Sequence, residues 1–93
     1  MIVSFKDSDT QRLWGTGKSR RIPASLRGSA NRKLAMLDAA VVLDELTVPP
    51  GNKLEALGGD RKGQHSIRVN DQFRVCFRWT AAGAADVEIV DYH

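Results

Sequence analysis

Several features that mark other classes of protein are scarce in this sequence. It has one cysteine, Cys76, and two histidines among 93 residues, which excludes an internal disulfide and a cysteine-based zinc site. Its apolar runs are far shorter than the roughly 18–20 residues that a membrane-spanning helix needs, and its first residues lack the pattern of a signal peptide. A chain of 93 residues has room for one domain, residues 1–93. We therefore expect a small cytoplasmic domain with no membrane contact, no metal and no cofactor.

The charge is distributed unevenly. The net charge is only +3, yet residues 10–37 hold no acidic residue. The basic residues of that segment are Arg12, Lys18, Arg20, Arg21, Arg27, Arg32 and Lys33. Such asymmetry favours a polyanionic partner or an acidic protein over a small neutral substrate. A basic surface that is merely solvated is the alternative.

Hydrophobic periodicity predicts two helices in the first half of the chain. Ser8, with Gln11 three residues on, fits a capping box at the start of a short first helix. A second helix is expected after Pro23, where apolar residues recur at spacings of three and four. These residues are Leu26, Ala30, Leu34, Leu37 and Val41. We expect this helix to end at the prolines at positions 49 and 50, which cannot continue it.

From residue 53 onward the apolar period changes to two. Alternating residues over 65–69, 73–79 and 87–90 predict strands with one face on the core and the other in water. Two helices followed by antiparallel strands predict an α+β fold, in which both N-terminal helices pack on one face of the sheet.

The predicted hairpin brings two arginines together. A three-residue connection at 70–72 pairs Ile67 with Val75 and keeps the apolar residues on one face. Arg68 then lies opposite Arg74 on the other face. Like charges that are directly opposed destabilise a hairpin, so this pair suggests that an anion binds between them.

The next predicted strand pair places a phenol beside these arginines. Pairing Arg74 with Tyr92 also pairs Arg78 with Glu88. Arg78 then has an acidic partner, whereas Arg68 and Arg74 have none. Guanidinium groups bind phosphate in a bidentate manner, and a tyrosine ring can stack on a base. The residues thus predict a small basic site for a phosphate-containing polymer.

An ordered set of short motifs resembles a known family. The set comprises Lys53-Leu54, Gly59-Asp60-Arg61-Lys62-Gly63, Ser66-Ile67-Arg68-Val69-Asn70, Phe73-Arg74-Val75 and the final Asp91-Tyr92-His93. It resembles the HigB-type toxins of the RelE/ParE superfamily of bacterial toxin–antitoxin systems, closely in the second half of the chain and by layout in the first. The resemblance implies a RelE-like fold. It also implies a ribosome-dependent endoribonuclease that cleaves messenger RNA without a metal, by attack of the ribose 2′-hydroxyl on the adjacent phosphorus.

The resemblance also implies roles for individual residues. Arg74 would stabilise charge on the phosphate. Tyr92 and His93 would orient the substrate and move protons, with support from Asp91. Glu55 stands where toxins of this family carry a histidine, and it would serve as a base. The expected RNA-binding residues are Lys53, Arg61, Lys62 and Arg68, together with Arg20 and Arg21, which would contact ribosomal RNA or the antitoxin.

The same resemblance implies the partners. They are the ribosome, messenger RNA and a HigA-like antitoxin with a helix-turn-helix, which would bring the toxin to operator DNA only as a complex. Two alternatives from other classes remain open at this point. One is a ParE-like inhibitor of DNA gyrase without nuclease activity, and the other is a basic nucleic-acid-binding module without catalysis.

Overall fold

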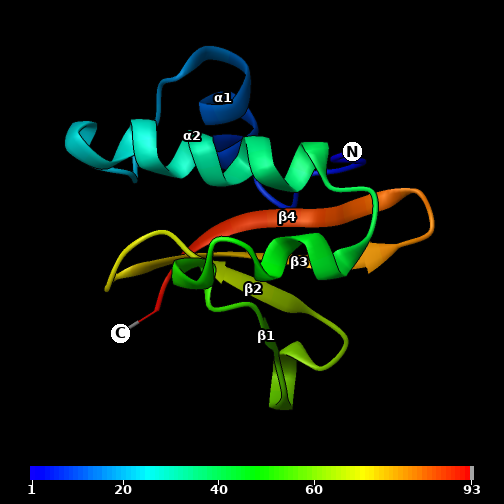
Figure 1. The fold of residues 1–93 in the computed structure, drawn as a ribbon. Coiled ribbons are helices and arrows are strands. Elements are labelled where there is room, and N and C mark those ends of the chain that lie inside the picture. Colours follow the sequence, from blue (N-terminus) through cyan, green and yellow to red (C-terminus); the bar gives the residue numbers. More distant parts are fainter. Residues whose placement is uncertain (93) are drawn as a thin grey trace.

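In the computed structural model, which describes residues 1–92, two helices precede an antiparallel sheet (Figure 1). The helices are α1, Ser8–Thr16, and α2, Ala24–Ala39. Short 3-10 helices follow at Leu43–Thr47, Pro50–Asn52 and Gly59–Arg61. The strands are β1, Glu55–Ala56, β2, His65–Arg68, β3, Phe73–Thr80, and β4, Gly83–Asp91.

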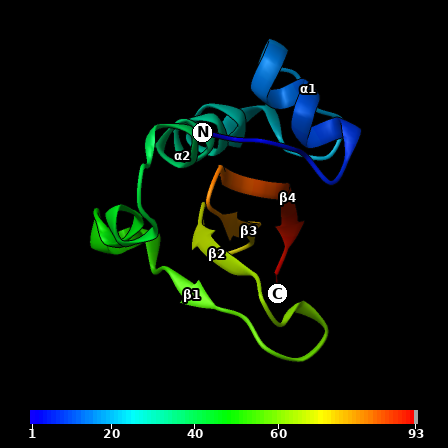
Figure 2. The same ribbon diagram turned by 90° about the vertical axis from the view of Figure 1, so that its right-hand side faces the viewer.

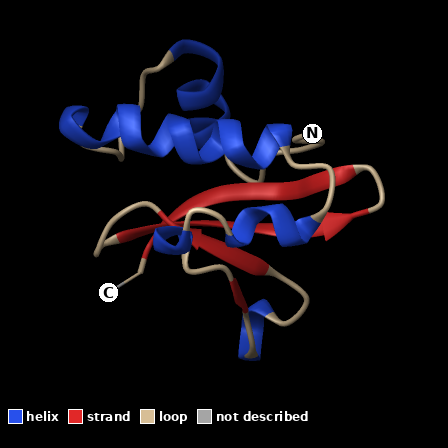
Figure 3. Ribbon diagram, in the orientation of Figure 1, coloured by secondary structure: helices blue, strands red, loops and turns tan. Residues whose placement is uncertain are grey.

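The sheet has the order β1-β2-β3-β4, and every neighbouring pair is antiparallel. Both helices cover the same face of this sheet, as Figures 2 and 3 show. Beyond β4, the N-terminal segment adds two parallel bridges, from Ile2 to Ala84 and from Phe5 to Val87. The predicted α+β architecture, with two N-terminal helices on one face of an antiparallel sheet, is confirmed. No helix among residues 1–92 is both long and apolar enough to cross a membrane.

Local chemistry explains where α1 begins and ends. The N-cap of α1 is Asp7, whose carboxylate accepts a hydrogen bond from the amide of Thr10, so the capping box predicted at Ser8 does not begin this helix. Gly17 ends α1 in the left-handed conformation, with a φ of 77°. The end predicted for α2 is wrong. This helix ends at Ala39, and Ala40 is already extended.

The apolar stripe of α2 faces the core over most of its predicted length. Ala30, Leu34 and Leu37 are fully buried against the sheet residues Ile67, Val75, Phe77, Val87 and Ile89. Val41 lies beyond the last helical residue and is 82% exposed. Val41 therefore does not belong to the apolar stripe of α2, because the helix ends at Ala39 and the extended chain directs Val41 to solvent.

The register of β2 against β3 is the predicted one, with Ile67 opposite Val75 and Arg68 opposite Arg74. The predicted register of β3 against β4 is wrong. Arg74 lies opposite Val90 rather than Tyr92, because the pairing starts with Thr80 opposite Gly83 and shifts by only one residue at an irregularity between Cys76 and Arg78. Between these two pairs β3 has one residue and β4 has two, so the bulge lies in β4. The alternation of β4 shifts by one residue there, and residues that face each other still share one side of the sheet.

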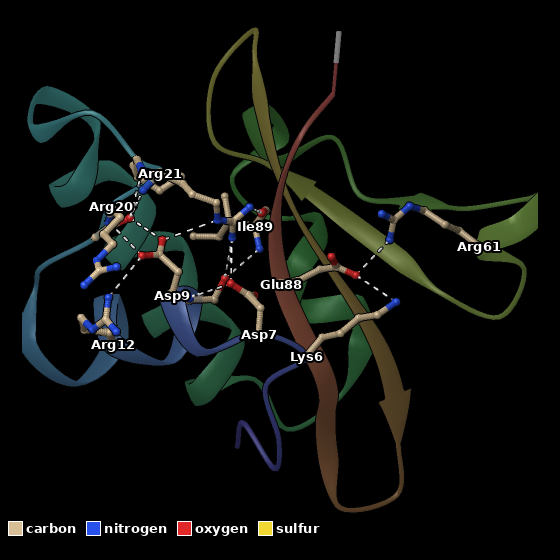
Figure 4. Close-up of polar contacts among 12 residues, drawn as sticks. Lys6, Asp7, Asp9, Arg12, Arg20, Arg21, Arg61, Glu88 and Ile89 are labelled. Atoms are coloured by element: carbon tan, nitrogen blue, oxygen red, sulfur yellow. Dashed lines mark hydrogen bonds and ion pairs between the residues drawn. The ribbon is translucent and has the colours of Figure 1, made fainter.

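A cluster of charged side chains fastens α1 and the following loop to β4. The Arg21 guanidinium lies 2.9 Å from an Asp7 oxygen and 3.6 Å from an Asp9 oxygen, and it donates to the carbonyl of Ile89 (Figure 4). Asp9 also accepts hydrogen bonds from Ser19 Oγ and from the Arg20 amide. Burial raises the pKa of Asp9, but these hydrogen bonds and the Arg21 charge outweigh it and hold the pKa below its usual value of 3.8.

The variant Asp9→Asn should lower the free energy of unfolding at neutral pH, by about 1–2 kcal/mol. Because the folded-state pKa is depressed, this stabilisation is present above the unfolded-state pKa and is lost as the pH falls through the folded-state value. The difference between the two proteins should therefore shrink between about pH 5 and pH 2. Urea denaturation across that range measures it.

The matched control for this experiment is Asp44→Asn. Asp44 is exposed, so its replacement should change stability by less than about 0.5 kcal/mol. A constant difference between wild type and Asp9→Asn at every pH would contradict the role given to the Asp9 carboxylate.

Candidate functional site

Charged and polar side chains gather on the sheet face that is turned away from α1 and α2, here called the distal face. The register places Ser66, Cys76 and Glu88 side by side on this face, in the centres of β2, β3 and β4. Arg68 and Arg74 form the next row. Because side chains alternate along a strand, the apolar residues between them point into the core beneath the helices.

Arg74 is the most constrained side chain of the distal face. Only 8% of it is exposed. Its Nε donates to Ser66 Oγ at 2.8 Å, and its Nη2 donates to the carbonyl of Lys53 at 2.6 Å. Its Nη1 lies 3.7 Å from Glu55 Oε1. The expectation of an exposed Arg74 without an acidic partner is therefore wrong, because Glu55 and the Lys53 carbonyl approach it from the segment beside β2.

Arg68 also has an acidic partner, contrary to the expectation. Its Nη2 forms a hydrogen-bonded ion pair with Asp71 in the β2–β3 connection. Burial lowers the pKa of Lys33, and the charges of Arg32 and Arg68 lower it further. Asp71 thus relieves the repulsion that the Arg68–Arg74 pairing creates.

The end of β4 places a phenol next to Arg74. The Tyr92 ring centre is 5.9 Å from the guanidinium carbon of Arg74, within the range of a cation–π contact. The Tyr92 amide donates to the carbonyl of Gln72 at 2.6 Å, and Gln72 Nε2 donates to Asp91 Oδ2 at 3.0 Å. The chain is therefore held by hydrogen bonds as far as Tyr92, whose side chain is 44% exposed. His93 lies outside the described residues.

The segment between β1 and β2 contributes Arg61. Its Nη1 donates to Glu88 Oε2 at 3.2 Å and to Gln64 Oε1 at 3.1 Å. Lys6 approaches the same Glu88 oxygen at 3.4 Å from the N-terminal segment (Figure 4). The predicted ion pair between Arg78 and Glu88 is consequently wrong, and Arg78 lies 3.7 Å from Asp86 instead.

The predicted site residues divide into those that meet on the distal face and those that do not. The contacts above bring Arg74 together with Glu55, the Lys53 backbone and Tyr92. Arg61 reaches the same face through its contact with Glu88. The side chains of Lys53 and Lys62 are exposed. Arg20 and Arg21 lie beside α1, and the Arg21 guanidinium is engaged with Asp7 and Asp9.

Sequence reasoning missed Ser66, Glu88 and Lys6 as members of the site. The predicted alternation of the strands puts Ser66 and Glu88 on the same face as Arg68 and Arg74, so both could have been predicted as members of the site. Lys6 could not have been found that way, because its place depends on the N-terminal segment that lies beside β4.

Cys76 is fully buried beneath this charged layer. Burial raises the pKa of its thiol, and Glu88 raises it further, against the opposing charges of Arg61, Arg74 and Lys6. The thiol therefore stays protonated at neutral pH and packs as a small side chain. Within residues 1–92, no three His, Cys, Asp or Glu side chains are grouped so as to hold a metal ion.

Residues 3–93 match the family model of the RelE-like toxin of the type II toxin–antitoxin system HigB. The chain belongs to this family of HigB-like toxins, whose systems pair each toxin with a cognate antitoxin.

Two curated relatives agree with this membership. The chain is 44% identical over 80 residues to Toxin HigB-1 of Vibrio cholerae, which covers 85% of this chain and 84% of the relative. It is 33% identical over 93 residues to Endoribonuclease HigB of Proteus vulgaris, which covers all of both chains.

Because Arg74 is buried and hydrogen-bonded, its removal should affect the fold as well as the site. Arg74→Ala leaves the Ser66 hydroxyl and the Lys53 carbonyl without their donor, so we expect a loss of about 1–3 kcal/mol in the free energy of unfolding. The midpoint of urea denaturation measures this loss.

Arg78→Ala is the matched control, since Arg78 and Asp86 are both about half exposed. It should cost less than about 1 kcal/mol, as exposed ion pairs do. Equal midpoints for the two variants would contradict the structural role of Arg74.

Proposed function

We propose that this toxin is a ribosome-dependent endoribonuclease that cleaves messenger RNA and thereby inhibits translation, with residues 1–93 acting as one toxin domain. The observation that carries the proposal is the contact between the Arg74 guanidinium and the Tyr92 ring on the distal face. The guanidinium is held in place, and the ring beside it is about half exposed. A nucleotide can place its phosphate against the first and its base against the second. The printed name of the Proteus vulgaris relative, an endoribonuclease, supports the same activity.

The chemistry that fits this site is internal transesterification. The ribose 2′-oxygen attacks the adjacent phosphorus, its proton passes to a base, and the 5′-oxygen departs after accepting a proton. The Arg74 guanidinium is held by Ser66 and Lys53 before substrate arrives. A cation that is oriented in advance stabilises the charge that develops on phosphate oxygens without reorganising during the reaction.

The proton carriers in this proposal are Glu55, Tyr92 and His93. The Glu55 side chain is 53% exposed and lies 3.7 Å from Arg74, so it can reach a substrate bound to that guanidinium and accept the 2′-hydroxyl proton. Tyr92 and His93 orient the scissile nucleotide and donate to the leaving oxygen. Asp91 supports them through the contact with Gln72 that holds the end of β4.

The remaining cations bind the RNA backbone in this proposal. Arg68 lies opposite Arg74, and the Lys53 backbone contacts it. Arg61 and Lys62 lie in the connection between β1 and β2. Arg20 and Arg21 lie on the helical side, where ribosomal RNA or the antitoxin would contact them. The antitoxin is a helix-turn-helix protein, and the toxin reaches operator DNA only as part of that complex. The toxin acts in the bacterial cytoplasm, where ribosomes and messenger RNA are found.

Induced expression in a bacterium, with mapping of RNA 5′ ends, tests the proposal. We expect growth arrest together with new 5′ ends inside translated regions, and loss of those ends when translation initiation is blocked. The Arg78→Ala variant should behave as the wild type does. Growth arrest with DNA damage and intact messenger RNA would instead support gyrase inhibition, and an absence of both effects would support a binding module without catalysis.

Variants at the end of the chain test the proton carriers. Tyr92→Phe keeps the ring over Arg74 and removes only the hydroxyl, so single-turnover cleavage on programmed ribosomes should slow by about 10²–10⁴-fold if that hydroxyl transfers a proton. His93→Gln should flatten the pH dependence of cleavage, because an imidazole titrates near pH ~6.5 and an amide does not. Identical pH profiles for His93→Gln and wild type would remove His93 from the chemistry.

A further inference from the structure

One carboxylate on the distal face is shared by two cations from distant parts of the chain. Glu88 Oε2 lies 3.2 Å from Arg61 Nη1 and 3.4 Å from Lys6 Nζ. The Glu88 side chain is only 16% exposed, whereas those of Arg61 and Lys6 are 31% and 54% exposed. The anion is thus covered, and both cations keep more exposed surface than it does. Figure 4 shows the two cations reaching the same carboxylate.

The backbones that carry these cations differ in how they are held. The N-terminal segment is fixed to β4, since the Lys6 amide donates to Val87 O and the Val87 amide donates to Ser4 O. Arg61 lies in the connection between β1 and β2. The strand at the start of this connection, β1, is joined to the sheet through only two residue pairs. The Arg61–Glu88 contact therefore joins the projecting connection to β4, the strand at the opposite edge from β1 (Figures 2 and 4).

The Arg61 guanidinium keeps part of its hydrogen-bonding capacity. In the described part of the chain, both of its side-chain hydrogen bonds use Nη1. Nε and Nη2 thus remain for a phosphate, which an arginine fork binds through two donors. Glu88 lies opposite Cys76 on β3, two residues along that strand from Arg74, so the Arg61–Glu88–Lys6 contacts and Arg74 lie in neighbouring rows of the distal face.

We propose that Glu88 is a positioning residue that holds Arg61 and Lys6 at one edge of the distal face, where both bind the RNA backbone. This inference rests on the proposed function, and it adds Lys6 to the RNA-binding residues. Two cations and one carboxylate leave a net positive charge at that edge. Glu88 does not touch the scissile phosphate, so it affects substrate binding and not the chemical step.

Kinetics on programmed ribosomes test the inference. Glu88→Gln should raise KM by about fivefold to tenfold, the equivalent of losing one ordinary hydrogen bond, while kcat changes less than about twofold. If Glu88 only repelled RNA, the same variant would lower KM. Asp86→Asn is the matched control, because it removes the same charge from the same strand beside Arg78, and its KM should stay at the wild-type value.

A mutant cycle tests whether Glu88 acts through these two cations. Adding Glu88→Gln to the double variant Arg61→Ala/Lys6→Gln should leave KM unchanged, because neither cation is left for Glu88 to hold. Lys6→Gln should raise KM and make it less dependent on salt, since one phosphate contact is lost. Additive effects, or a salt dependence unchanged by Lys6→Gln, would overturn the inference.

A measurement on the free protein separates this inference from the proposed function. In ¹⁵N relaxation experiments, the Arg61 Nε–H should be rigid in wild type and mobile in Glu88→Gln, whether or not the protein cleaves RNA. If wild type cleaves no messenger RNA, the proposed function fails. The relaxation result still shows whether Glu88 positions Arg61. Equal Arg61 mobility in both proteins would overturn the positioning role, and Lys6→Gln serves as the kinetic variant should Glu88→Gln not fold.

Discussion

A nearly buried guanidinium must find acceptors inside the protein, because removing a cation from water without compensation is strongly unfavourable. Arg74 finds them on three elements: Ser66 on β2, the Lys53 carbonyl before β1, and the Glu55 carboxylate on β1. One side chain thus connects the edge of the sheet to its centre. The geometry of the distal face depends on this set of contacts, because Tyr92 lies against the same guanidinium.

The elements that depend on local pattern were predictable. The apolar residues of α2 and the alternation in β2 and β3 fix which faces are buried, and a three-residue connection then leaves one register for the hairpin. This register was confirmed down to Arg68 opposite Arg74. The end of α2 was not predictable, since the prolines at positions 49 and 50 follow a 3-10 helix that the apolar pattern does not mark.

The site was predictable in its composition but not in its pairing. The β3–β4 register depends on the tight turn after Thr80 and on a one-residue bulge in β4, and the apolar alternation marks neither of them. In this register Glu88 partners Arg61 and Lys6, and Arg78 partners Asp86. The burial of Arg74 depends on Glu55 and Lys53, which are distant in sequence, so alternation alone assigned it to solvent.

The N-terminal segment has a consequence for how another chain can approach the sheet. Val3 and Lys6 donate to backbone carbonyls of β4, and Met1 and Ser4 accept from it, so the ladder at Ala84 and Val87 is occupied from within the molecule. An edge that is already paired offers no template for strand addition. A partner that binds along this part of β4 must therefore recognise side chains rather than extend the sheet, and the same closure guards the protein against edge-to-edge aggregation there.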